Sequence, residues 1–211
     1  MPPVATARTR IRRLPDRGHY DFATITAIID AAYLCHIAFQ WDGSVHSLPT
    51  AHWRDGDYLY IHGAKASRLL AALVAGEASV TIAHVDGLVF ARSAFHHSMN
   101  YRSVVIYGRF EPAPESDKSA ALAAFIERLA PGRWEQLRPA SAKELNATSV
   151  LRIPLHEASA KIRNWGVKDD EEDMVWPVWA GVVPLQLRYG AAETDALSVV
   201  SQPPDNLPKE R

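Results

Sequence analysis

The sequence predicts a mainly β protein in which a mostly antiparallel β-barrel carries peripheral helices. Short runs of apolar and branched residues recur through the first half of the chain, which is typical of strands. Tight-turn signals separate most of these runs, at Asp42-Gly43, Asp55-Gly56-Asp57 and Asp86-Gly87. Only one helical pattern interrupts them, whereas a parallel sheet needs a crossover between successive strands. An antiparallel barrel is therefore favoured over a βαβ sheet.

Composition and length indicate one ordinary globular domain. Apolar residues make up 47% of the chain and charged residues 22%, with a formal net charge of -1, so nothing indicates a nucleic-acid partner. No segment approaches the ~20 apolar residues of a membrane span. The single cysteine, Cys35, lies in an apolar run and is expected to be a buried thiol. We therefore expect a cytoplasmic protein with no membrane partner.

The chain divides into three parts by composition. Residues 1–17 contain five arginines and form a basic lead-in, either solvated or packed across a partner subunit. Residues 18–188 hold the alternating and helical patterns of a single domain. Residues 189–211 are polar and proline-bearing, which is typical of a poorly ordered tail.

The first half of the domain begins with a helix and continues as strands. Asp21 is the expected cap of a helix that presents Ile25, Ile28 and Ile29 on one face. Strands are expected over residues 33–40, 45–53 and 58–62, the second of them broken by Pro49. A helix then begins near residues 65–67 and ends at Gly76 in a left-handed cap.

The second half continues with a hairpin and then turns helical. Residues 79–85 and 88–91 are expected to pair through a tight turn at Asp86-Gly87, before a long strand over residues 101–110. A helix carries Leu122 and Phe125 on its apolar face, and a capping box at residues 141–144 starts a short second one. Residues 150–155 form a strand whose Pro154 favours an edge position, and the acidic residues 169–173 form a solvated face.

The turn after the third strand suits a phosphate group. Gly63 allows the backbone to turn, and the following helix start carries Lys65, Ser67 and Arg68. Free amides and the positive dipole end of the helix would face an anion, and the two cations and the hydroxyl would add hydrogen bonds. An ordinary strand-to-helix connection with solvated cations explains the same pattern.

Two further segments are candidates for chemistry. The apolar run around Trp176 and Trp179 would either wall an aromatic ligand or simply pack in the core. His96 and His97, with His84 and His62, are candidate metal ligands, but neighbouring residues on an extended chain point to opposite sides, so no metal site is predicted. No nucleophile-elbow pattern surrounds any serine, so a hydrolase is not favoured either.

Several short motifs, taken together in order and spacing, resemble the flavin-nucleotide-binding branch of the pyridoxamine 5′-phosphate oxidase-like proteins, which are related to the nitroimidazole-resistance proteins. The motifs are residues 20–21, 36–39, 48–50, 59–64, 67–68, 86–89, 98–105 and 179–185. The resemblance covers roughly residues 16–185. It implies an FMN-binding split β-barrel that forms a homodimer, with FMN between the two subunits.

The resemblance also implies which residues contact the cofactor. Ile61 and His62 would lie beside the flavin, Ser67 and Arg68 would anchor its phosphate, and Lys65 is added on its charge. The remaining expected contacts are Ser47, Leu48, Pro49 and Thr50 beside the ring, Tyr101, Arg102 and Ser103 on the long strand, and Trp179 stacked near the ring.

The resemblance implies FMN-dependent oxidation or reduction of a small aromatic or nitro-type molecule, with no residue assigned as catalytic. True pyridoxamine phosphate oxidases carry an Arg-x-His element near the carboxyl end, and this chain has no histidine after His156, so pyridoxal phosphate synthesis is not expected. A non-catalytic flavin-binding or sensing module remains an alternative. Haem binding is a third, which the nine histidines permit.

Overall fold

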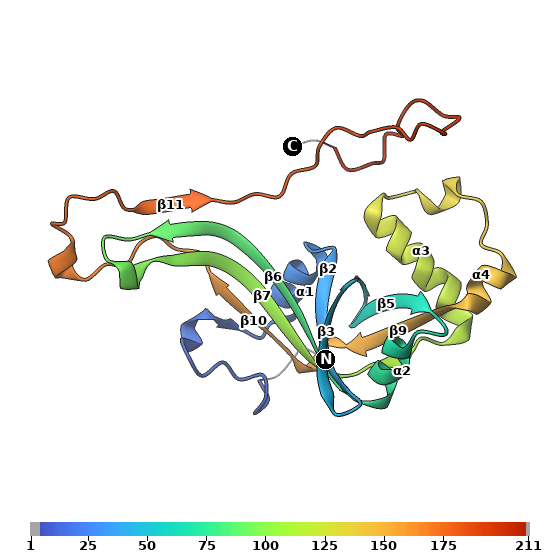
Figure 1. Ribbon diagram of the computed structural model, residues 1–211, viewed down its shortest axis with the longest axis horizontal. Coiled ribbons are helices and arrows are strands. Elements are labelled where there is room, and N and C mark those ends of the chain that lie inside the picture. Colours follow the sequence, from blue (N-terminus) through green and yellow to red (C-terminus); the bar gives the residue numbers. More distant parts are fainter. Residues whose placement is uncertain (1–4, 210–211) are drawn as a thin grey trace.

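Two antiparallel sheets form the body of the computed structural model, which describes residues 5–209 (Figure 1). The larger sheet has the order β1 (Gly18–His19), β10 (Ala158–Arg163), β7 (Ser98–Arg109), β6 (Glu77–Phe90), β2 (Leu34–Trp41), β3 (Ser44–Ala51), and β11 (Gly181–Pro184) also pairs with β6. The smaller sheet has the order β4 (Trp53–Asp55), β5 (Tyr58–Ala64), β9 (Thr148–Pro154), β8 (Glu111–Pro112). The predicted mainly antiparallel β class is confirmed.

The helices lie around the sheets, and their ends follow the local signals in the sequence. They are α1 (Phe22–Asp30), α2 (Arg68–Ala75), α3 (Lys118–Leu129) and α4 (Ala142–Ala147), with short 3-10 turns at Pro15–Arg17, Ala94–His96, Glu115–Asp117, Trp134–Gln136, Leu155–Glu157 and Glu171–Asp173. The Asp21 carboxylate accepts from the Thr24 amide, and Ser141 with Glu144 forms the predicted capping box. None of the helices in the described part of the chain is long and apolar enough to cross a membrane.

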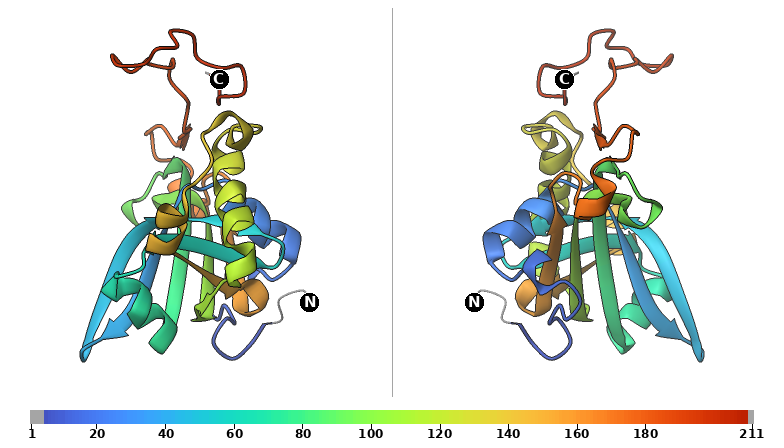
Figure 2. Two further views of the ribbon diagram at one scale, coloured as in Figure 1. Left: turned by 90° about the vertical axis from the view of Figure 1, so that its right-hand side faces the viewer. Right: turned by 90° about the vertical axis from the view of Figure 1, so that its left-hand side faces the viewer.

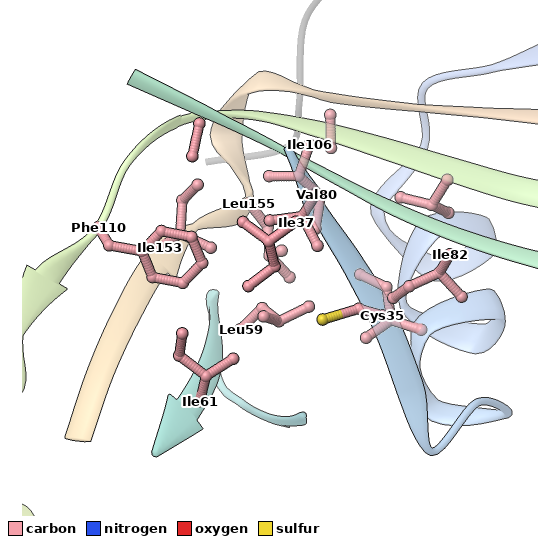
Figure 3. Close-up of a cluster of buried hydrophobic side chains, with 14 of the residues drawn as sticks. Cys35, Ile37, Leu59, Ile61, Val80, Ile82, Ile106, Phe110, Ile153 and Leu155 are labelled. Atoms are coloured by element: carbon pink, nitrogen blue, oxygen red, sulfur yellow. The ribbon is translucent and has the colours of Figure 1, made fainter. Parts of the chain in front are cut away.

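Strand β5 lies between two apolar clusters, because successive side chains of a strand point to opposite faces. Leu59 and Ile61 face the main core between the two sheets, where they meet side chains of the larger sheet (Figure 3). Tyr60 faces the other way, into a smaller cluster with Trp53 that α3 covers. His62 is two residues after Tyr60, so its side chain lies on the same face of β5 and also points toward α3.

The hairpin of β6 and β7 is much longer than the barrel and extends from it as a curved ribbon (Figures 1 and 2). One edge of β6 pairs with β7. The other edge pairs with β2 within the barrel and with β11 beyond it. The predicted hairpin at Asp86-Gly87 is wrong, since β6 is one strand with a bulge between Val85 and Gly87. A Cβ on Gly87 would lie 3.1 Å from the Val183 carbonyl oxygen, so the glycine lets β11 approach.

Three local predictions also need correction. Strand β3 is not broken at Pro49, because β3 is an edge strand and a proline there removes no ladder bond. Strand β9 is internal, and Pro154 is its last residue, beyond the positions that β8 reaches. Gly76 is extended, with φ of -134°, so α2 does not end in a left-handed cap.

The basic segment before β1 lies against the domain through Arg8, which pairs with Glu77 at 2.9 Å and with Glu157. The Arg8 guanidinium also lies 4.9 Å from the centre of the Tyr107 ring. A fully solvated lead-in is therefore wrong at this residue.

Candidate functional site

The predicted phosphate loop connects β5 to α2. Ser67 is the residue before the helix, and its Oγ lies 3.5 Å from the Leu70 amide nitrogen. The Lys65 backbone amide is occupied, because it donates to the Ala147 carbonyl at 2.8 Å. The Lys65 and Arg68 side chains pair with no carboxylate among residues 5–209, so both charges remain available to an anion.

Arg68 links this loop to the hairpin of β2 and β3, since its guanidinium lies 5.2 Å from the centre of the Trp41 ring. The residues from Ser47 to Thr50 lie on β3, whose outer edge pairs with no other described strand. Backbone amides on that edge therefore remain open to a polar ligand, as the resemblance implies. The Ile61 side chain is buried in the core, so only its backbone can face such a ligand.

The other expected contacts lie elsewhere in the same chain. Arg102 donates two bonds of 2.9 Å to Asp86, and the Ser103 hydroxyl donates to the Lys161 carbonyl at 3.3 Å. Strand β7, which carries Tyr101 and these two residues, is separated from β3 by β6 and β2, a distance of about 14 Å.

Trp179 lies farther from β3 than strand β7 does. Its ring centre lies 6.0 Å from that of Phe90, at the far end of β6. Phe90 is nine residues beyond Thr81, which pairs with β2, and that length of strand spans about 30 Å. One chain therefore does not bring all the expected residues to a single cofactor.

Trp176 and Trp179 do not pack in the core, since both side chains are mostly exposed. They precede β11, whose Val183 pairs with Leu88 of β6, which in turn pairs with Met99 of β7. Directly paired residues lie on the same face of a sheet, so Val183, Leu88 and Met99 form a row. All three are between 38% and 47% exposed, which leaves an apolar face uncovered on this ribbon.

A separate cavity of about 430 Å³ lies between β5 and the helical segment of residues 118–148. Its walls are largely apolar and are formed by His62, Leu122, Phe125, Ile126, Trp134, Leu137, Arg138, Ala140, Glu144, Leu145 and Thr148. The volume is in the range of sites for small ligands. The apolar face of α3 was evident in the sequence, but the cavity beneath it was not.

His62 is the histidine of this cavity. Its ring lies 5.1 Å from the Phe125 ring and 5.7 Å from the Trp53 ring, measured between centroids. Nδ1 is buried without a hydrogen-bond partner, and within the described residues neither ring nitrogen makes a hydrogen bond. Burial lowers the pKa of His62, so the imidazole is neutral and has a lone pair to offer.

The other candidate histidines do not join His62. The His84 Nε2 lies 3.0 Å from the Ile28 carbonyl oxygen, and the His97 Nδ1 lies 2.9 Å from the Ser93 carbonyl oxygen. His96 lies near the acidic loop, with Nδ1 3.9 Å from Asp169.

The solvated character predicted for the acidic loop is wrong at Asp169, whose side chain is 0% exposed. Its carboxylate accepts from the Arg92 guanidinium at 2.9 Å and from the Arg92 amide. Burial acts to raise the pKa of Asp169, but the bonds from Arg92 outweigh it and hold that pKa below its usual value. His96, Asp169 and Asp173 offer ligand atoms within 4.8 Å of one another, but Asp169 is already neutralised by Arg92.

A family model described as pyridoxamine 5′-phosphate oxidase matches residues 21–162 of the chain. No curated protein matches the chain.

Among solved structures, the flavocytochrome Anf3 from Azotobacter vinelandii is 40% identical, with a TM-score of 0.94 over 100% of this chain and 99% of that one. The FAD- and haem-binding protein from Mycobacterium smegmatis is 33% identical, with a TM-score of 0.87 over 92% of this chain and 98% of that one. A putative 5-nitroimidazole antibiotic resistance protein from Bacteroides thetaiotaomicron is 19% identical, with a TM-score of 0.58 over 69% of this chain and 86% of that one, and this shows similarity of fold alone.

Proposed function

Because the chain belongs to the pyridoxamine 5′-phosphate oxidase family, we propose that it is a redox protein that holds a flavin nucleotide and, in the cavity beside His62, a haem. Two relatives that match nearly the whole chain support both groups, since one is a flavocytochrome and the other binds FAD and haem. The observation that carries the proposal is His62, a neutral imidazole without a hydrogen-bond partner in an apolar cavity.

The cavity has a volume in the range of small-ligand sites, and its chemistry fits a haem. Histidine is a common axial ligand of haem iron, and His62 would supply that nitrogen. The apolar side chains of α3 would cover the porphyrin, and Arg138, which lines the cavity and pairs with Glu144, would supply a cation for a haem carboxylate. A bound haem would supply one-electron chemistry. Helices α3 and α4 would exclude water from the cavity. Trp53 and Phe125, whose rings both pack against the His62 ring, would orient that imidazole.

The flavin would occupy the loop and edge strand described above. Lys65, Ser67 and Arg68 would hold its phosphate, since neither cation, Lys65 or Arg68, has a carboxylate partner in the described chain. Backbone N–H groups of the segment Ser47–Thr50, in which Pro49 has none, would donate to the polar edge of the ring. We propose FAD as the nucleotide on the strength of the relative from Mycobacterium smegmatis, and the FMN expected from the resemblance is the other outcome of the test.

A homodimer would complete the flavin site. The exposed row of Leu88, Met99 and Val183 is a surface that a second copy of the chain would cover. A second copy would also bring its own Tyr101–Ser103 strand and Trp179 toward the phosphate loop of the first, which the distances within one chain do not allow.

The proposed activity is flavin-dependent oxidation or reduction of a small molecule, with aromatic and nitro-type acceptors the first class to assay. The exposed tryptophans at residues 176 and 179 support a planar partner. If no pair of electron donor and acceptor turns over the bound flavin, the protein is instead a binding or sensing module.

The test is the absorption spectrum of the purified protein, with mass spectrometry of the groups it releases. Wild type is expected to show a flavin band and a Soret band, and to release haem and either FAD or FMN. His62→Ala is expected to lose the Soret band and keep the flavin, whereas His156→Ala, at an exposed histidine far from the cavity, keeps both. Full haem content in His62→Ala would remove His62 from the site, and a colourless wild type would overturn the proposal.

A further inference from the structure

A second cavity of about 430 Å³ lies where three distant segments meet. The first is the 3-10 turn at Pro15–Arg17, the second is the connection of residues 95–98 between β6 and β7, and the third follows β10. Its lining is about half polar, and among the described residues it includes Arg17, Arg163 and Lys168 and a single carboxylate, that of Asp16. The pocket therefore has an excess of positive charge.

The three cations gather around one aromatic ring, that of Trp165. The Arg17 and Arg163 guanidinium carbons and the Lys168 Nζ each lie 5.1 Å from the centre of this ring. The quadrupole of the ring attracts each cation, but it does not cancel the repulsion among three like charges. An anion placed in the cavity would relieve that repulsion.

Arg163 has a further feature that points to a ligand. It is 3% exposed, and its guanidinium donates to the carbonyl oxygens of Trp165 and Gly166, at 2.7 and 2.9 Å, and to the side-chain oxygen of Asn100, all of which are neutral. Its Nε is buried and has no acceptor among residues 5–209. Burial and the charge of Arg17 lower the pKa of Arg163. A buried guanidinium normally has a carboxylate or another anion beside it.

Within residues 5–209, no carboxylate forms an ion pair with any of the three cations. Of the acidic residues nearby, Asp169 is held by Arg92, and Asp170 and Asp173 lie 3.8 Å from the His96 ring, which also lines the cavity. We propose that this cavity binds a phosphate or diphosphate group.

Two sources of that group have the same chemistry. One is the diphosphate of the flavin itself, in which case the inference rests on the proposed function and this cavity, instead of the loop at Lys65, would hold the flavin's phosphates. The other is a separate phosphorylated small molecule, such as a nucleotide that donates electrons. The experiment below separates the two.

The probe is inorganic diphosphate, titrated by calorimetry into the full-length protein both as purified and after its cofactors have been stripped. Lys168→Ala and Arg17→Ala each remove one of the charges, and each is expected to weaken binding by roughly tenfold or more. Arg12→Ala is the matched control, because it removes one exposed charge from the same segment without lining the cavity. The exposed Lys168 and half-buried Arg17 are preferred to Arg163, whose loss would disturb folding.

Each outcome decides the question. Binding by the protein as purified, weakened in Lys168→Ala and Arg17→Ala but not in Arg12→Ala, identifies a separate phosphorylated ligand. Binding only after stripping, with weaker flavin retention in Lys168→Ala, identifies the flavin's own diphosphate. Absence of binding in both forms, or equal binding by all three variants, overturns the inference. Flavin and haem content are read from the spectrum, so a failure of the proposed function is seen independently.

Discussion

His52 and His62 are both neutral, but only His62 lines a cavity. His52 is fully buried, and its Nε2 donates to the Ile29 carbonyl oxygen at 3.1 Å, so it ties α1 to the segment before β4. His62 has no such bond and opens onto the space beneath α3. The structural histidine is therefore fully buried and bonded to the backbone, whereas the candidate ligand is half-buried and opens onto a cavity.

The stability of the protein is expected to fall as the pH drops below about 6.5, the ordinary pKa of a histidine side chain. Burial lowers the pKa of His52 to about 4, from 6.5, so in the window between these values the unfolded chain binds a proton that the folded chain does not. Stability is therefore fully present above this window and is lost as the pH falls through it. The contribution lost between pH 7.5 and 4.5 is about 2 to 3 kcal/mol.

Urea denaturation at these two pH values measures the effect. His52→Leu is expected to show a smaller pH-dependent loss than wild type, although it also loses about 1 kcal/mol with the Ile29 bond. His156→Leu is the exposed control. An unchanged pH dependence in His52→Leu would assign the loss to other groups, of which His62, with a pKa shifted in the same direction, is the first.

The phosphate loop gives a second prediction at the scale of residues. Arg68→Ala is expected to weaken flavin retention by about 1.5 to 3 kcal/mol, because a charge-assisted bond to phosphate is lost. Ser67→Asp keeps a good helix cap but adds a negative charge, so it should weaken the flavin without lowering stability. Fluorescence of released flavin measures retention, with Arg13→Ala as the exposed control. Equal retention in all four proteins would place the phosphate elsewhere.

At the scale of elements, β11 depends on the bulge in β6. Gly87→Ala would place a Cβ 3.1 Å from both Val182 Cγ1 and the Val183 carbonyl oxygen, closer than most such contacts, so β11 must shift away. We expect faster hydrogen exchange at the amides of β11 and, because Trp179 precedes that strand, weaker flavin binding. Gly166→Ala is the control, because a Cβ there meets nothing within 4 Å. Unchanged exchange in Gly87→Ala would show that the strand accommodates the methyl group.

The sequence predicts those elements whose signals are local. The Asp21 cap and the capping box of Ser141 and Glu144 each require only residues three positions apart, and the structure has both. Asp86-Gly87 has the local form of a turn, but in the structure it is a bulge within β6, at the start of the stretch that pairs with β11. Strand β11 lies nearly a hundred residues later in the chain, so the local sequence does not reveal this pairing. Likewise, Asp169 is buried because Arg92 reaches it from the end of β6, and no pattern around residue 169 shows that contact.

At the scale of the whole molecule, the same reasoning explains which parts of the candidate site were predicted. Lys65, Ser67 and Arg68 follow one strand, so their proximity can be read from the sequence. The cavity beside His62 is built by α3 and α4, which are 56 or more positions later in the chain. Only the folded structure brings these helices next to β5. The cationic cavity around Trp165 joins three segments in the same way.

The last prediction concerns the assembly. If a second copy covers the row of Leu88, Met99 and Val183, then Leu88→Glu places a charge in the middle of an apolar interface and should yield a monomer. In the proposed dimer the flavin site takes residues from both copies, so the same variant should lose flavin but keep its fold and the cavity beside His62, which lies within one chain. Sedimentation velocity gives the mass, and the spectrum gives both cofactors. Val199→Glu adds the same charge at a fully exposed residue of the tail and should remain a dimer with flavin. A Leu88→Glu dimer that retains its flavin, or a wild-type monomer with full flavin content, would show that one chain suffices and that the exposed row has another purpose.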